Sequence, residues 1–238
     1  MIVINQVTKK RATKTAEKTV LQDISCIIPK NKITALIGKS GAGKTTLLRC
    51  IAGLEDFSDG SITVAGISLN DVLPSSRASF IGFVFQNYSL FSNLTALENC
   101  VQPLMVVRGF SHEDAEKKAG AMLALLGVEI FRFSYPRELS GGPQQRVALA
   151  RTMCMEPQAI LLDEPTSALD GENTKILQDV LKNLCARGVT VLLSSQDSQF
   201  VKAVAQTMYL LEDGEVIEQA DGGVVQLAPE SKIAQFLQ

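Results

Sequence analysis

The sequence has few of the side chains that bind transition metals or form disulfides. Its 238 residues include one histidine, His112, and five scattered cysteines with no C-x-x-C pair among them. A metal-ligand cluster of histidine and cysteine is therefore not indicated, and neither is a disulfide framework. Isolated cysteines of this kind are typical of a chain that works in a reducing compartment such as the cytosol.

Long hydrophobic runs are also missing. No apolar stretch approaches roughly 18 residues, the length that suggests a membrane-spanning helix, and no signal peptide is recognisable. We therefore expect a chain that neither crosses a membrane nor leaves the cell by that route. If the chain acts at a membrane, a partner must hold it there.

Charge of one sign is not in excess. The formal net charge is -2, and the 46% hydrophobic and 20% charged residues are ordinary for a globular protein. This balance gives no general attraction for nucleic acid, so any binding of anions must be local. The length allows a sizeable core, built either as one domain with an insertion or as two domains.

The strongest local signal is a glycine-rich loop between the apolar run at residues 33–37 and a helical pattern. The loop consists of Gly38, Lys39, Ser40, Gly41, Ala42, Gly43, Lys44, Thr45 and Thr46. Its G-x-x-x-x-G-K-T spacing is that of a phosphate-binding loop, in which glycines let backbone N–H groups face the anion and the following helix adds its positive end. We expect Lys44 to bind the β- and γ-phosphates of a triphosphate and Thr45 to offer its hydroxyl to Mg²⁺.

Strand and helix patterns alternate along most of the chain. Runs typical of strands lie at residues 2–7, 20–28, 61–64, 80–85, 159–162, 189–193, 208–211 and 216–217. Helical patterns lie near residues 143–154, 172–187 and 197–205. This alternation around a phosphate-binding loop predicts an α/β fold of the P-loop NTPase kind, with a mostly parallel sheet covered on both faces.

Residues 88–156 have a mainly helical pattern, because apolar residues recur at helical spacing in 95–107 and 112–126. We predict an inserted α-helical subdomain at 88–156 and a nucleotide-binding core made of residues 1–87 and 157–238. The first two strand-like runs, separated by a basic polar stretch, are expected to form an antiparallel β subdomain within that core.

Two adjacent carboxylates follow the apolar run at 159–162. Successive side chains of a strand point to opposite sides, so Asp163 and Glu164 are expected to have different roles. We assign Asp163 to Mg²⁺, directly or through water, and Glu164 to the general base that polarises an attacking water molecule. A pair of solvated charges is the simpler alternative for an isolated acidic dipeptide, but the upstream phosphate-binding loop favours catalysis.

A second helix start with anion-binding character lies at residues 139–146, which read Leu-Ser-Gly-Gly-Pro-Gln-Gln-Arg. With this segment the chain resembles the ATP-binding subunit of an ABC transporter over almost its whole length. Residues 139–146 are similar to the signature motif of that family, and residues 167–170, Ser-Ala-Leu-Asp, are similar to its D-loop. Gln86 is similar to the Q-loop glutamine, which couples the nucleotide site to a membrane partner.

The resemblance implies a head-to-tail homodimer, or a pair with another ATPase subunit, around two ATP molecules. Each ATP would lie between the Lys44 loop of one chain and Ser140, Gly141 and Gly142 of the other. Gln86 is implied as a further ligand of Mg²⁺. The implied location is peripheral, at the cytoplasmic face of the membrane, with transmembrane permease subunits as partners, a solute-binding protein as an indirect partner and no role for nucleic acid.

Within the family, residues 93–99 and 135–140 look most like importers of polar amino acids. Relatives in lipoprotein release and cell division share similar runs. An ABC protein that works on DNA or ribosomes would need a long coiled-coil insertion or a second cassette, and this sequence has neither.

Two departures from the family pattern concern nucleotide contacts. Pro143 replaces a glutamine in the signature motif, but the helix should survive because an N–H in its first turn has no intrahelical partner. The family also stacks an aromatic ring on adenine, whereas no Phe, Tyr or Trp precedes Phe57 here. Arg11 lies near the matching position. Its guanidinium could stack on the base instead, and a solvated basic side chain is the alternative.

The third departure is Gln196, which occupies the position of the family's switch histidine; His112 is too far along the chain to replace it. The amide of Gln196 can donate a hydrogen bond to the γ-phosphate but cannot carry a proton or a positive charge. We therefore expect an ATPase that energises transport and that is weakened at this position. The alternative is a nucleotide-gated dimerising subunit with very slow or no hydrolysis.

Overall fold

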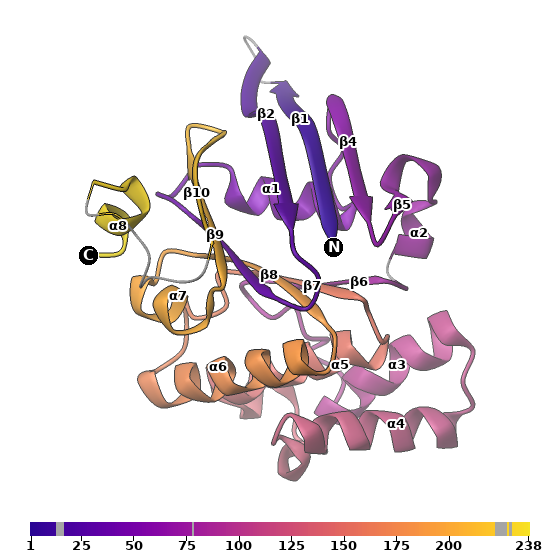
Figure 1. Cartoon of the computed structure of the whole chain (residues 1–238). Helices are drawn as coiled ribbons and strands as arrows, with labels where there is room; N and C mark the ends of the chain where they lie inside the picture. The colour runs from indigo at the N-terminus through magenta and orange to yellow at the C-terminus, as the bar shows by residue number, and fades with distance from the viewer. Residues whose placement is uncertain (13–16, 78, 222–227, 229) are drawn as a thin grey trace.

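The strands form two sheets, with a helix between them (Figure 1). In this computed structural model the described residues are 1–12, 17–77, 79–221, 228 and 230–238. The larger sheet has six strands in the order β10-β9-β3-β8-β7-β6. Its members are β3 (Ile33–Ile37), β6 (Ile81–Val84), β7 (Ala159–Asp163), β8 (Thr190–Ser195), β9 (Thr207–Glu212) and β10 (Glu215–Asp221). All neighbours pair in parallel except β9 and β10, which confirms the predicted mostly parallel sheet.

The smaller sheet is antiparallel and has the order β2-β1-β4-β5. It contains β1 (Ile2–Ala12), β2 (Glu17–Ile28), β4 (Asp59–Val64) and β5 (Ile67–Ser68). β1 and β2 extend beyond the runs expected from the sequence, because backbone pairing continues after the apolar alternation ends. Arg11 pairs with Lys18 in this exposed continuation.

The helix α1 (Lys44–Ala52) lies between the two sheets (Figure 1). Its apolar residues Leu47, Leu48 and Ile51 are fully buried in a core shared with β1, β2 and one face of the larger sheet. Successive residues of β7 point to opposite faces of the larger sheet. Leu161 packs in the hydrophobic core that contains α1, whereas Ile160 packs in the hydrophobic core on the other face of that sheet. Because the central strands are buried on both faces, they read as continuous apolar runs.

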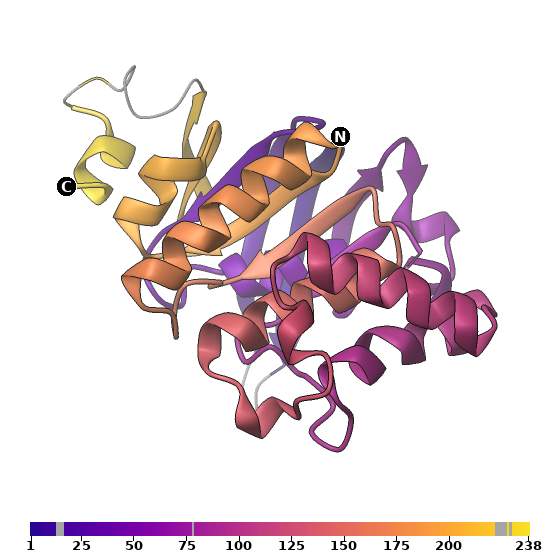
Figure 2. The ribbon, with the colours of Figure 1, turned by 90° about the horizontal axis from the view of Figure 1, so that it is seen from below.

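The remaining helices cover the opposite face of the larger sheet and extend beyond it. They are α3 (Ala96–Arg108), α4 (His112–Leu125), α5 (Gly141–Cys154), α6 (Gly171–Ala186), α7 (Ser198–Val204) and α8 (Lys232–Phe236). The helix α2 (Pro74–Arg77) and three 3-10 turns, at Leu69–Asp71, Glu129–Phe131 and Pro136–Glu138, lie in connections. Figure 2 shows α3 and α4 beside each other, to one side of α6. α5 begins two residues before the predicted position of 143 and continues through Pro143.

In the described part of the chain, no helix has the length and hydrophobicity needed to span a membrane.

Buried Asn99 fixes the segment that leads into α3. Its side-chain amide donates to the carbonyl oxygens of Phe91, Leu94 and Thr95, and its oxygen accepts from the N–H of Phe91 at 2.8 Å. Arg151 of α5 holds the same segment through the carbonyls of Tyr88 and Ser89. Backbone groups that a loop leaves unpaired are thus satisfied by two side chains.

We expect Asn99→Ala to lower the free energy of unfolding by about 2 to 3 kcal/mol, because several backbone groups lose their partners at once. Thermal unfolding should show a decrease in Tm of roughly 4 to 12 °C. The control is Gln102→Ala, on the exposed side of the same helix, which should leave Tm unchanged. Equal Tm values for the two variants would contradict this role of Asn99.

Candidate functional site

The glycine-rich loop has a backbone that only glycine allows at two of its positions. Gly38 and Gly43 have φ angles of 144° and 106°. A Cβ at Gly38 would collide with the carbonyl oxygen of Leu211, and one at Gly43 would lie 2.8 Å from a methyl group of Leu21. The loop is therefore pressed between β9 and β2, and it leads directly into the N-terminus of α1. Helix dipole and free N–H groups favour an anion at this place.

Lys44 is buried, and its side chain contacts the loop that precedes it. Its Nζ atom donates to the carbonyl oxygens of Gly38 at 2.7 Å and Lys39 at 3.1 Å, and it lies 3.7 Å from Oε1 of Glu164. Burial lowers the pKa of the Lys44 ammonium group, while Glu164 acts in the opposite direction. A second anion near Nζ would therefore favour the charged form.

Asp163 connects the loop helix to the sheet. Its Oδ1 atom accepts hydrogen bonds from the hydroxyl of Thr45 at 2.8 Å and from the hydroxyl of Ser194 at 2.7 Å. Asp163 and Ser194 are both buried. Ser194 could not be identified as a site residue from the sequence, because a serine within an apolar strand carries no motif that marks it.

The backbone changes direction at Glu164, immediately after β7 ends at Asp163. Its φ angle is 45°, and its N–H donates to Oγ of Ser194 at 2.9 Å. Gln196 donates two hydrogen bonds to the Glu164 carboxylate. Its backbone N–H donates to Oε2 and its side-chain Nε2 donates to Oε1, both at 3.1 Å. The two neighbouring carboxylates thus have separate partners, and Gln196 contacts Glu164 directly.

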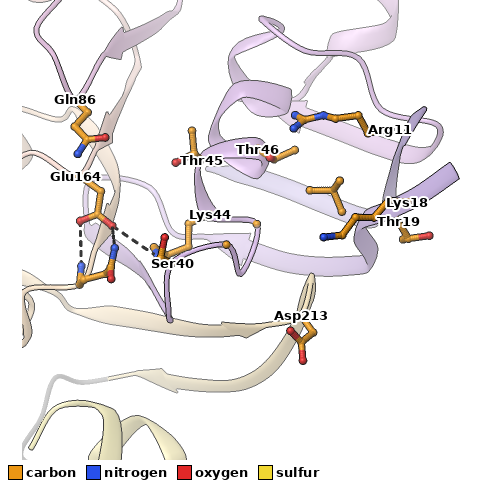
Figure 3. Close-up of a pocket in the computed structure, with 14 residues that line it drawn as sticks. Arg11, Lys18, Thr19, Ser40, Lys44, Thr45, Thr46, Gln86, Glu164 and Asp213 are labelled. Carbon is orange, nitrogen blue, oxygen red and sulfur yellow. Dashed lines mark hydrogen bonds and ion pairs between the residues drawn. The ribbon is translucent and has the colours of Figure 1, made fainter. Parts of the chain in front are cut away.

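These groups surround one cavity of about 560 Å³ (Figure 3). Ten of the site residues predicted from the sequence line this cavity: Arg11, Ser40, Gly41, Gly43, Lys44, Thr45, Thr46, Gln86, Glu164 and Gln196. Four further lining residues were not predicted as site residues: Lys18, Thr19, Val20 and Asp213. They come from β2 and from the turn between β9 and β10, which only the folded chain brings to the loop. Gly38, Lys39, Ala42 and Asp163 support the cavity without lining it.

The cavity has a phosphate end and a second end. Glu164, Gln86 and Lys44 lie at one side in Figure 3, and Arg11, Lys18 and Thr19 lie at the other. Backbone donors, a buried ammonium group and a helix N-terminus are suited to a chain of phosphates. The space beyond them is suited to the rest of a nucleotide.

Ser140, Gly141 and Gly142 do not line this cavity. They form the start of α5, where the side chain of Ser140 makes no capping bond. A Cβ at Gly141 would lie 2.7 Å from the carbonyl oxygen of Ala168, and one at Gly142 would collide with the side chain of Asn173. The two glycines are therefore needed for packing against the segment that follows β7, and this helix start remains separate from the phosphate end of the same chain.

Comparison with known proteins places these features in one family. Residues 21–167 match the family model described as ABC transporter. The glutamine transport ATP-binding protein GlnQ of Escherichia coli K12 is 39% identical over 222 residues, which cover 92% of each chain. The L-cystine transport system ATP-binding protein TcyN of the same organism is 37% identical over 93% of this chain and 92% of its own.

Solved structures agree with the sequence comparison. A dimeric, post-hydrolysis structure of the ATP-binding cassette MJ0796 bound to ADP and phosphate superposes with a TM-score of 0.85 and 34% identity, over 93% of this chain and 98% of that one. The resemblance seen in the sequence and the predicted P-loop NTPase fold are thus confirmed.

We expect Lys44→Ala to weaken MgATP binding by at least roughly 100-fold, because the variant loses a charge aimed at the phosphates. Tm should change little, since Lys44 lies in the loop and burial disfavours its charge. Isothermal titration and thermal unfolding measure the two effects. Lys32→Ala, an exposed lysine before β3, is the control. Unchanged ATP affinity in Lys44→Ala would rule out its assignment.

Proposed function

Because the chain belongs to the ABC transporter family as an ATP-binding, ATP-hydrolysing subunit, we propose that it energises the import of a polar amino acid. The observation that carries the ATPase function is the assembly of Lys44, Thr45 and Glu164 around one cavity. The relatives GlnQ and TcyN are named for the transport of glutamine and L-cystine, and this supports the substrate class. Transmembrane permease subunits and, indirectly, a solute-binding protein are the proposed partners, at the cytoplasmic face of the membrane.

The residues beside the phosphate end fit a magnesium ion. Thr45 and Asp163 present oxygen atoms in direct contact with each other, and Gln86 lines the same cavity. Magnesium prefers such hard ligands and is usually held by one or two carboxylates together with substrate phosphates. Thr45, Asp163 and Gln86 would hold it, and the bound ion would neutralise charge on the β- and γ-phosphates.

We assign Glu164 as the general base. Lys44 lies close enough to Glu164 to form an ion pair, so an incoming triphosphate competes with this carboxylate for the ammonium group. With Lys44 engaged by phosphate, Glu164 accepts a proton from the water whose oxygen bonds to the γ-phosphorus, while the bond from that phosphorus to the bridging oxygen breaks and ADP leaves. Gln196 keeps the carboxylate in place through its two hydrogen bonds.

The separate position of the signature segment supports a composite site. The side chain of Ser140 makes no capping hydrogen bond at the N-terminus of α5, and it lies outside the cavity of its own chain. A second chain arranged head to tail would bring this helix start to the phosphates, and the dimeric state of the structurally similar cassette supports a dimer. We therefore propose two ATP molecules between two chains, either identical chains or this chain with another ATPase subunit.

Glu164→Gln should bind ATP without hydrolysing it and hold the dimer closed, because the amide keeps the shape of the side chain but cannot accept the proton. Light scattering with saturating MgATP should show a stable dimer. The wild-type chain under the same conditions is the comparison and should return to monomer as ATP is consumed. A variant that stays monomeric with ATP bound would count against the composite site.

Gln196→His should raise kcat of the isolated chain by at least roughly tenfold, about 1.4 kcal/mol. A histidine can strengthen its hydrogen bond as charge develops on the phosphate, whereas the amide has a fixed dipole. We expect slow but measurable turnover in the wild type and little change in nucleotide affinity. Steady-state phosphate release at saturating MgATP measures the effect.

Gln196→Asn is the matched control, because the shorter amide cannot reach Oε1 of Glu164 and should lower kcat further. If Gln196→His and Gln196→Asn both leave kcat unchanged, the side chain of residue 196 does not take part in catalysis, and a lower kcat in Gln196→His would contradict the gain expected from histidine. Turnover at background level in the wild type and in Gln196→His alike would favour the nucleotide-gated, non-hydrolysing subunit.

A further inference from the structure

A second cavity lies outside the nucleotide site, where the end of α4, the side of α5 and the side of α6 meet. Its volume is about 290 Å³. Ligand cavities usually measure about 300 to 1,000 Å³, so this one admits a small molecule but not a nucleotide. None of its lining residues lines the cavity around Lys44.

Most of the wall of this second cavity is apolar. Leu125 and Leu126 come from the end of α4, and Ile176, Val180 and Leu184 come from α6. The side chain of Leu125 is 37% exposed, so the protein leaves part of this apolar wall in contact with solvent. An aliphatic group placed in the cavity would cover that surface, which is favourable.

Arg146 of α5 contributes a positive charge to the apolar wall. Its Nε atom is buried and has no hydrogen-bond partner among the described residues. Burial lowers the pKa of the guanidinium, and none of the ion pairs of the described residues includes it. A Cβ at Gly127 would lie 3.8 Å from Nη1, so the guanidinium extends to the end of α4. A half-buried cation of this kind favours a carboxylate ligand, whose two oxygens match the guanidinium fork.

Asp179 of α6 contributes a negative charge to the same cavity. It is exposed, and it forms no ion pair with Arg146 or with any other described residue. The cavity therefore combines one cation, one anion and an apolar wall. A ligand that complements all three has a carboxylate, an ammonium group and an aliphatic side chain.

We propose that this cavity is a binding site for a small aliphatic α-amino acid such as leucine, with the carboxylate at Arg146, the ammonium group at Asp179 and the side chain against the apolar wall. An inorganic anion would leave the apolar wall uncovered and would be repelled by Asp179. An uncharged apolar molecule would leave the guanidinium without a partner. The α-amino acid satisfies every group that lines the cavity.

An occupied cavity would join α5 to α6 at a second point. Gly142 lies one turn before Arg146 on α5 and already packs against Asn173 of α6. The amino acid would therefore act on the helix that begins with the signature segment. The inference does not depend on nucleotide binding, because the two cavities share no residue.

The test is isothermal titration of the full chain with L-leucine at millimolar concentrations and with compounds that each lack one part of it. 4-Methylpentanoate lacks the ammonium group, 3-methylbutylamine lacks the carboxylate, and glycine lacks the side chain; inorganic phosphate is the anion alone. L-leucine should bind most tightly. 4-Methylpentanoate should bind about threefold more weakly, and the amine, glycine and phosphate at least about tenfold more weakly.

Three variants assign the contacts. Arg146→Gln should weaken L-leucine and 4-methylpentanoate at least about tenfold, because both lose the partner of their carboxylate. Asp179→Asn should weaken L-leucine about threefold without weakening 4-methylpentanoate, which has no ammonium group. Lys175→Gln is the control, since Lys175 is exposed on α6 and does not line the cavity, and it should change no affinity more than twofold.

Thermal unfolding checks that each variant is folded. Since Asp179 is exposed, Asp179→Asn keeps the test decisive even if Arg146→Gln fails to fold. No binding of L-leucine to the wild type would overturn the inference, and so would equal affinities for L-leucine and glycine. Unchanged L-leucine affinity in both Arg146→Gln and Asp179→Asn would place any bound amino acid elsewhere. Phosphate that binds as tightly as L-leucine would make Arg146 a general anion site only.

Discussion

The site depends on one buried carboxylate. Oδ1 of Asp163 accepts hydrogen bonds from Thr45 at the start of α1 and from Ser194 at the end of β8. Asp163 ends β7, so this single atom connects the phosphate-binding helix to two central strands of the sheet. Buried polar groups of this kind are costly when unpaired, and a fully paired set fixes a single geometry. The position of the phosphate-binding loop relative to the sheet follows from this connection.

The geometry of Asp163 also separates it from its neighbour. Asp163 accepts hydrogen bonds from Ser194 of the sheet and from Thr45. The left-handed backbone at Glu164 directs the next carboxylate toward Lys44 and Gln196. Lys44, Glu164 and Gln196, to which we assign catalysis, line one cavity of a single chain. The helix start at Ser140 is held elsewhere by the packing of its glycines, which supports the proposal that a second chain completes the site.

The sequence could predict the parts of the site that are contiguous. The phosphate-binding loop and the carboxylates at 163–164 follow apolar strands, and backbone conformation within a few residues determines their chemistry. Lys18 and Asp213 could not be found in this way, because β-strand pairing brings them to the cavity and no local pattern marks them. The role expected for Gln196 at the γ-phosphate stays a prediction, and its bond to Glu164 needed the folded chain to be seen.

The central claim, a site shared between two chains, is tested most directly by complementation. In a Glu164→Gln background, where bound ATP is not consumed, one chain carries Lys44→Ala and the other Ser140→Arg. Retention of radiolabelled ATP after gel filtration is measured for each chain alone and for their mixture. The account predicts that neither chain alone retains ATP and that the mixture does, because one intact Lys44 loop then faces one intact Ser140 helix. Full retention by the Ser140→Arg chain alone would contradict the account, since a single chain would then suffice.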